Sequence, residues 1–120
     1  MQRFARYTLV GAFATAVHYA LLALVVEGLH WPAWLGSGIG AVVGAQVAFA
    51  GNRAFTFGHA GDVAPAWAKF QGTAMAGALL GMAIVGGGVR LGLHYLAAQV
   101  IATGAGLVLT FAINRAWTFR

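Results

Sequence analysis

Two Asn-Arg pairs are the polar groups in this sequence whose types and spacing best suit the binding of a ligand. Asn52 and Arg53 lie in VAFAGNRAFTF, residues 47–57, and Asn114 and Arg115 lie in LTFAINRAWTF, residues 109–119; the two stretches agree at seven of eleven positions. An arginine offers several donors to a phosphate, and Asn can add neutral hydrogen bonds. The pairs therefore predict a site for a lipid phosphate, while simple anchoring of helix ends at the membrane surface is the alternative explanation.

Two further cations recur with nearly the same spacing. Arg6 lies 46 residues before Asn52, and Lys69 lies 45 residues before Asn114. Because all of these groups fall near the ends of apolar stretches, they could meet a phosphate at one membrane surface. The predicted phosphate-binding set is Arg6, Asn52, Arg53, Lys69, Asn114 and Arg115.

Uncharged polar residues recur along two of the apolar stretches at helical spacing. The last stretch carries Gln99, Thr103, Gly106, Thr110 and Asn114, and the first carries Thr8, Gly11, Thr15 and His18. Residues three and four apart share one helical face, and such a face should point away from lipid, where polar groups would lack partners. We expect a possible substrate path along Thr15, His18, Gln99, Thr103 and Thr110, with an interhelical hydrogen bond as the alternative role of His18.

The same inventory argues against catalysis and metal binding. The four histidines, at 18, 30, 59 and 94, show no ligand spacing, and the chain has no cysteine. The only acids, Glu27 and Asp62, are predicted to lie on opposite sides of the membrane, so neither a catalytic pair nor a carboxylate within a span is available. We expect no enzymatic activity, no metal and no cofactor, and we reject a small multidrug transporter, whose proton coupling needs a buried carboxylate.

The elements that must position these groups are membrane helices. Hydrophobic residues make up 61% of the 120-residue chain, charged residues 8%, and the mean hydropathy is +0.81. Four uncharged stretches, about 7–26, 34–51, 70–89 and 91–113, each have roughly the 20 residues that a helix needs to cross a bilayer. The predicted fold is all-α, a polytopic membrane protein with four transmembrane helices in a single domain, 1–120.

Charge and repetition predict how these helices are arranged. Arg3, Arg6, Arg53, Lys69, Arg115 and Arg120 fall on one side against Asp62, which places both termini and the middle loop in the cytoplasm. The expected location is the cytoplasmic (inner) membrane. The internal repeat, 1–60 and 65–120, gives each half two helices, so the halves form two helical hairpins in parallel orientation.

Small residues recur every four positions in the middle of the chain, at Gly36, Gly40, Gly44 and Ala48 and again at Thr73, Gly77 and Gly81. Such faces let helix backbones approach closely, so helix packing is the main interpretation and a groove lined by glycine the alternative.

The order of the short motifs resembles the GtrA-like family of small membrane proteins over essentially the whole chain. The motifs are RYTLVG before the first span, NRAFTF after the second, KFQGTA at the third and NRAWTF after the fourth. Carried over to this sequence, the family pattern marks Arg6, Asn52, Arg53, Thr56, Phe57, Lys69, Asn114, Arg115, Thr118 and Phe119.

The resemblance implies translocation, or flipping, of a polyprenyl-phosphate-linked sugar across the cytoplasmic membrane for cell-surface polysaccharide synthesis or glycosylation. The alternative is a non-transporting adaptor that anchors or regulates a polyprenyl-phosphate glycosyltransferase. Partners expected on this basis are the lipid-linked sugar, membrane lipids and possible glycosyltransferase partners, with no role for nucleic acid. Four short helices enclose little volume, so we also expect a homo-oligomer.

Overall fold

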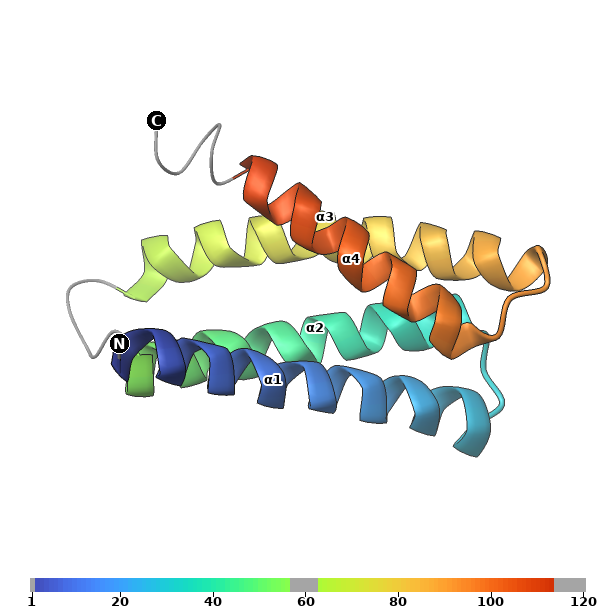
Figure 1. Cartoon of the computed structure of the whole chain (residues 1–120), viewed down its shortest axis with the longest axis horizontal. Coiled ribbons are helices and arrows are strands. Elements are labelled where there is room, and N and C mark those ends of the chain that lie inside the picture. Colours follow the sequence, from blue (N-terminus) through green and yellow to red (C-terminus); the bar gives the residue numbers. More distant parts are fainter. Residues whose placement is uncertain (1, 57–62, 114–120) are drawn as a thin grey trace.

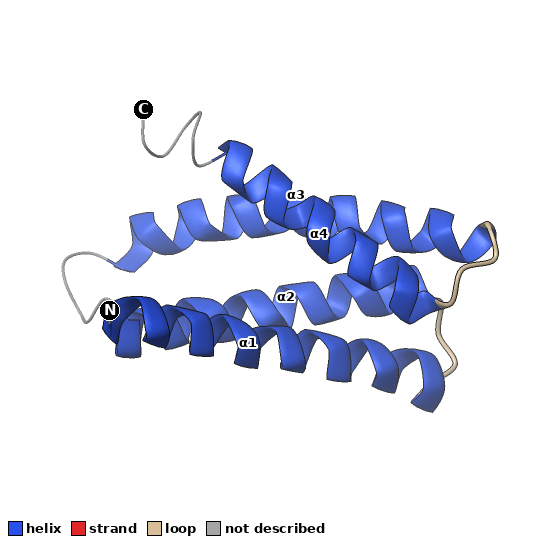
Figure 2. Ribbon diagram, viewed as in Figure 1, coloured by secondary structure: helices blue, strands red, loops and turns tan. Residues whose placement is uncertain are grey.

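The described residues of the chain form four long helices. The computed structural model describes residues 2–56 and 63–113. The helices are α1 (Gln2–Ala23), α2 (Ala33–Gly51), α3 (Val63–Arg90) and α4 (Tyr95–Ile113), and the π-helical turns η1 (Leu24–Gly28) and η2 (Asn52–Thr56) continue α1 and α2 (Figures 1 and 2). Four segments are long and apolar enough to cross a membrane, namely Thr8–Gly28, Ala33–Ala54, Trp67–Arg90 and Tyr95–Ile113. The all-α fold with four membrane helices is confirmed, because within lipid only a helix or a closed barrel satisfies its own backbone.

The turn between α3 and α4 explains why α4 begins at Tyr95 and not at Leu91, where the uncharged stretch starts. The N–H of Leu93 donates to the carbonyl of Gly88 at 2.9 Å and that of Gly92 to Val89 at 3.0 Å, and Gly92 has φ +97°. This is a Schellman motif, which ends a helix with a left-handed residue. His94 Nδ1 then accepts from the N–H of Leu96 at 3.1 Å and caps α4.

The turn between α1 and α2 stands at the equivalent place in the sequence repeat. His30 is the non-glycine residue with positive φ, 58°, and it lies 62 positions before Gly92. The first and last residues of α2, Ala33 and Gly51, likewise lie 62 positions before Tyr95 and Ile113. The second and fourth helices thus have the same length and the same place in the two halves.

Close backbone approach joins α1 to α2. A Cβ added at Gly40 would lie 2.6 Å from the carbonyl oxygen of His18, and one added at Gly44 would lie 3.2 Å from that of Ala14. The small-residue face of α2 is therefore used for packing against α1. Packing continues in chain order, with α2 against α3 and α3 against α4, and Figure 1 shows α4 crossing α3 obliquely.

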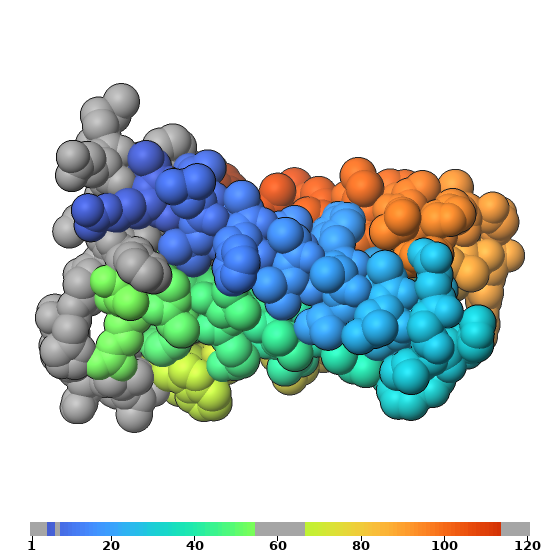
Figure 3. All heavy atoms as spheres, turned by 90° about the horizontal axis from the view of Figure 1, so that it is seen from below, coloured from blue at the N-terminus to red at the C-terminus, as the bar shows by residue number. Residues whose placement is uncertain are grey.

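The helices alternate in direction, so their ends gather at two opposite ends of the bundle (Figure 1). We call the end that carries Arg6, Arg53 and Lys69 the basic end, and the end that carries Glu27 and Gly92 the turn end. Figure 3 shows the face formed by α1 and α2, with α4 along one edge and α3 along the other. That the basic end faces the cytoplasm stays a prediction.

Candidate functional site

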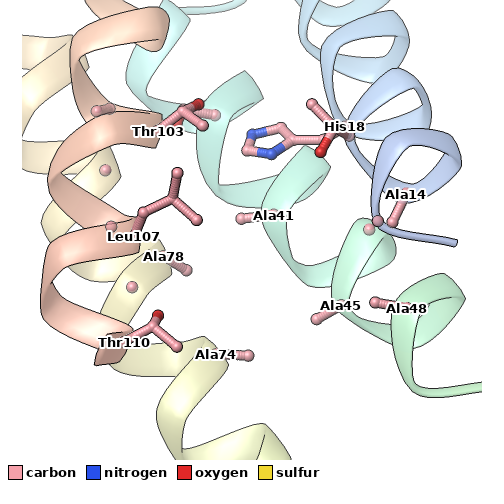
Figure 4. Close-up of a pocket in the computed structure, with 18 of the residues that line it drawn as sticks. Ala14, His18, Ala41, Ala45, Ala48, Ala74, Ala78, Thr103, Leu107 and Thr110 are labelled. Atoms are coloured by element: carbon pink, nitrogen blue, oxygen red, sulfur yellow. The ribbon is translucent and has the colours of Figure 1, made fainter. Parts of the chain in front are cut away.

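The four helices surround a cavity of about 300 Å³. This volume is at the lower end of the range of ligand pockets. Every residue of the expected substrate path lines it: Thr15 and His18 from α1, and Gln99, Thr103 and Thr110 from α4. Figure 4 shows His18 and Thr103 on facing walls, with Ala41 of α2 between them. The lining also includes Ala45 and Ala48 of α2 and Ala74 and Ala78 of α3. The structure therefore brings the polar faces of the first and last helices to one space.

The cavity is closed toward the turn end by a chain of hydrogen bonds. Ser37 Oγ donates to Gln99 Oε1 at 2.6 Å, and Gln99 Nε2 donates to Thr103 Oγ1 at 3.3 Å. The hydroxyl groups of Tyr19 and Thr103 are 2.7 Å apart. Because Ser37 and Gln99 are only 1% and 2% exposed, these bonds satisfy groups that would be costly to bury alone. Gln99 thus joins α4 to α2 through an interhelical hydrogen bond, a contact that we call the Ser37–Gln99 tie, and it also lines the cavity.

Ser37 and Gln99 occupy equivalent positions of the repeat, 62 residues apart. A direct hydrogen bond thus joins equivalent residues of the two halves. Other lining residues follow the same relation, since Ala41 and Thr103 are equivalent and so are Ala48 and Thr110. The helices α2 and α4 therefore contribute equivalent positions to the lining of the cavity.

Beyond this chain of hydrogen bonds, the lining between α1 and α4 becomes accessible. Thr15 and Leu107 are exposed, and Thr110 is half-buried. Added Cβ atoms at Gly11, Gly77 and Gly106 would meet no other atom within 4 Å among the described residues, so these glycines keep the space free. The glycine stripe of α3 thus lines a groove, whereas that of α2 packs against a helix.

The cavity offers hydrogen bonds but no charge. Each residue of the described chain that lines it is uncharged or, at His18, an imidazole. Nε2 of His18 is buried without a hydrogen-bond partner in the described part of the chain. A buried polar atom of this kind is usually paired with a water molecule or a ligand. The chemistry of the lining suits a neutral group that carries hydroxyls.

Cationic side chains lie at the basic end beside this cavity. Arg6 on α1 and Arg53 on η2 line two shallow depressions that share Ala54. Asn52 continues the helical hydrogen bonding, because its N–H donates to the carbonyls of Ala48 and Phe49. Lys69 is exposed on the first turns of α3. Asn114, Arg115, Thr118 and Phe119 lie outside the described residues, as does Phe57.

Several polar contacts were not expected from the sequence. Tyr19 bridges α1 to α4, and its position four residues after Thr15 is the signal that could have revealed it. The Tyr95 hydroxyl donates to Glu27 at the turn end. Between α2 and α3, Gln46 and Gln71 exchange hydrogen bonds at 2.7 and 3.4 Å. Within residues 2–56 and 63–113 there is no cluster of three or more metal-ligating side chains.

These features define a class of protein: a multi-pass membrane protein in which four described helices surround an uncharged, mostly apolar cavity that carries hydroxyl and imidazole groups. The chain matches the family described as GtrA/DPMS, transmembrane domain, over residues 6–119, and it belongs to that family. Membership supports a membrane function in polysaccharide synthesis or glycosylation. Comparison with curated proteins gives no match. Comparison with solved structures gives none either.

Proposed function

We propose that this protein moves a polyprenyl-phosphate-linked sugar across the cytoplasmic membrane. The observation that carries the proposal is the neutral cavity between the four helices, which lies next to arginines at one end of the bundle. A lipid-linked sugar carries both kinds of group, because hydroxyls suit the lining and the phosphate suits the guanidinium groups. The small volume favours one compact head group inside the bundle.

In this proposal the roles of the residues follow from their places. Arg6 and Arg53, with Asn52 and Lys69, hold the phosphate at the membrane surface, and Asn114 and Arg115 complete the set from the second repeat. Thr15, Thr103 and Thr110 offer hydrogen bonds to the sugar, and His18 supplies its unpaired Nε2. Opening toward the other side requires the Ser37–Gln99 tie to break, since that tie closes the cavity.

Purified protein in liposomes tests this proposal. We expect the protein to accelerate transbilayer movement of a polyprenyl-phosphate sugar, and Arg53→Ala to weaken lipid binding by about tenfold, the loss of roughly one charge-assisted hydrogen bond. Arg90→Ala is the matched control, because Arg90 is an exposed arginine at the turn end of the bundle, opposite the end that carries Arg53. Equal effects of the two variants on binding, or no acceleration by the native protein, would contradict the proposal.

The alternative, an adaptor for a glycosyltransferase, needs a surface for the partner. The most suitable small-residue face, that of α2 with Gly36, Gly40 and Gly44, is already in contact with α1. This occupancy favours transport over anchoring through that face. Native mass spectrometry of gently extracted protein distinguishes them, since an adaptor should retain a glycosyltransferase whereas a transporter should retain lipid, alone or as a homo-oligomer.

A further inference from the structure

The two halves of the bundle should present two equivalent lines of contact, which we call seams. The α2/α3 seam relates to the α4/α1 seam by the sequence repeat, whose offset is 62 residues between α2 and α4 and 63 residues between Arg6 and Lys69. If the two halves were equivalent in structure, both seams would be packed alike. They differ, because α2 packs along α3 whereas α4 leans away from α1 toward the basic end (Figure 1).

Polar and aromatic ties hold the α2/α3 seam closed near the basic end. Gln46 and Gln71 bond to each other, and Trp67 Nε1 donates to Gln46 Oε1 at 3.3 Å. The rings of Phe49 and Phe70 lie 5.4 Å apart between centroids. Amide hydrogen bonds of this kind hold helices together within a membrane.

The α4/α1 seam lacks the glutamine pair of the α2/α3 seam. The equivalent of Gln46 is Val108, which cannot form the hydrogen bonds and is 70% exposed. In the register that pairs Arg6 with Lys69, the equivalent of Gln71 is Thr8. Phe111, the equivalent of Phe49, is 66% exposed. The two seams therefore differ in the side chains that could join their helices.

The open seam is continuous with the cavity. Leu107 lines the cavity and is nevertheless 68% exposed, and Thr15 on the facing helix likewise both lines the cavity and is exposed. The seam is apolar on α4, at Leu107 and Phe111, and it lies within segments that span the membrane. At that depth the medium outside the seam is hydrocarbon.

We propose that the seam between α1 and α4 holds the hydrocarbon chain of the lipid-linked substrate, so that the substrate reaches the cavity sideways from the bilayer. The head group then lies among Thr15, Thr103 and Thr110 while the chain lies against Leu107 and Phe111. An amphiphile, a molecule with a polar head group and an apolar chain, matches three features together. These are the hydroxyl groups in the cavity, the apolar side chains at the seam and the cationic side chain of Arg6. The inference rests on the proposed function, because it takes the substrate to be a lipid.

A photoreactive probe tests the proposal on the whole chain in liposomes. The probe is a polyprenyl phosphate with a diazirine on its chain, and mass spectrometry of peptides locates the labelled residues with and without excess unlabelled polyprenyl phosphate. We expect competition to remove labelling at Leu107 and Phe111 but to leave that at Met75 and Leu79, which are exposed on α3 and do not line the cavity. Competition at α3 equal to that at the seam overturns the proposal.

Matched tryptophan substitutions give an independent measurement. Leu107→Trp should reduce the competed labelling by about tenfold, which corresponds to about 1.4 kcal/mol of binding free energy. Leu79→Trp replaces a leucine of similar exposure on α3 and should change it less than about twofold, well under that energy. Because Leu107 is exposed, its replacement should leave the fold intact, which a thermal melt in detergent checks. Equal effects of the two substitutions contradict the proposal.

Transport measured in the same liposomes separates the two proposals. Competed labelling at the seam without lipid movement supports the seam and overturns the transport function. Lipid movement without competed labelling at the seam supports transport and overturns sideways access.

Discussion

At the scale of single residues, the interior of this bundle is held by neutral polar pairs. Ser37, Gln99, Thr103 and Tyr19 form one connected chain of hydrogen bonds, and no charged side chain takes part. In a medium of low dielectric constant an unpaired polar group costs more than a pair contributes, so such a chain is stable only when its members are paired. His18 Nε2 is the exception among the described residues, since it is buried without a hydrogen-bond partner, and it is therefore a candidate to bind a ligand.

Removal of one member of the Ser37–Gln99 pair should therefore cost more than removal of both. We expect Gln99→Leu to lower the free energy of unfolding by about 1–3 kcal/mol, because it leaves the Ser37 hydroxyl buried without its partner. The double variant Ser37→Ala with Gln99→Leu should lose less than the sum of the single variants. Reversible unfolding in mixed detergent micelles measures all three, and additive losses would contradict a direct tie between the two residues.

At the scale of helices, glycines with the same spacing have two different tasks. Gly40 lets α2 touch the backbone of α1, whereas Gly77 on α3 faces open space in the cavity among the described residues. Both sit in a small-residue stripe of period four, so the stripe itself does not say which task applies. The difference arises because Gly40 of α2 lies against α1, whereas Gly77 of α3 lies against the cavity.

Substitution of these two glycines should separate packing from function. Gly40→Ala should destabilise the protein by about 1–3 kcal/mol, since a Cβ there overlaps the His18 backbone, which cannot move without shifting α1. Gly77→Leu should fill the cavity and slow lipid movement while the melting temperature stays near that of the native protein.

Gly87→Leu is the matched control for the cavity-filling change, because Gly87 is exposed on the same helix and nothing in the described chain lies within 4 Å of its added Cβ. Transport should be unaffected in that variant. A loss of transport in Gly87→Leu as large as in Gly77→Leu would show that leucine on α3 acts without regard to the cavity.

At the scale of the whole molecule, charge is divided between the two ends. Arg6, Arg53 and Lys69 lie at the basic end, while the turn end has Arg90 and Glu27, which is in contact with Tyr95. Basic residues are retained on the cytoplasmic side during insertion. By this rule the basic end is predicted to face the cytoplasm.

Cysteine labelling tests this orientation directly, since the chain has no cysteine of its own. In intact bacterial cells a membrane-impermeant maleimide should label Leu91→Cys at the turn end but not Ala54→Cys at the basic end. Both positions are exposed, so the protein itself does not shield either cysteine from the reagent. Permeabilised cells should show labelling of both, and the reverse pattern in intact cells would refute a cytoplasmic basic end.

The number of helices, their approximate bounds and the family could all be predicted from the sequence. Hydropathy over about 20 residues is a local property, and lipid leaves a chain of this kind little choice but helix. The polar faces could also be predicted, because Thr15, His18, Thr103 and Thr110 follow helical spacing, and they do line one cavity. The start of α4 was missed, since it depends on the conformation of Gly92 and on the cap from His94.

Tertiary structure alone decided which faces meet. The repeat predicts two equivalent seams, but the α2/α3 seam is closed and the α4/α1 seam is open. The sequence contains a difference between the seams, Gln46 on α2 against Val108 on α4, yet its consequence depends on how helices far apart in the chain cross and rotate. Local periodicity determines what a helix shows on each face, and only packing between helices determines what that face touches.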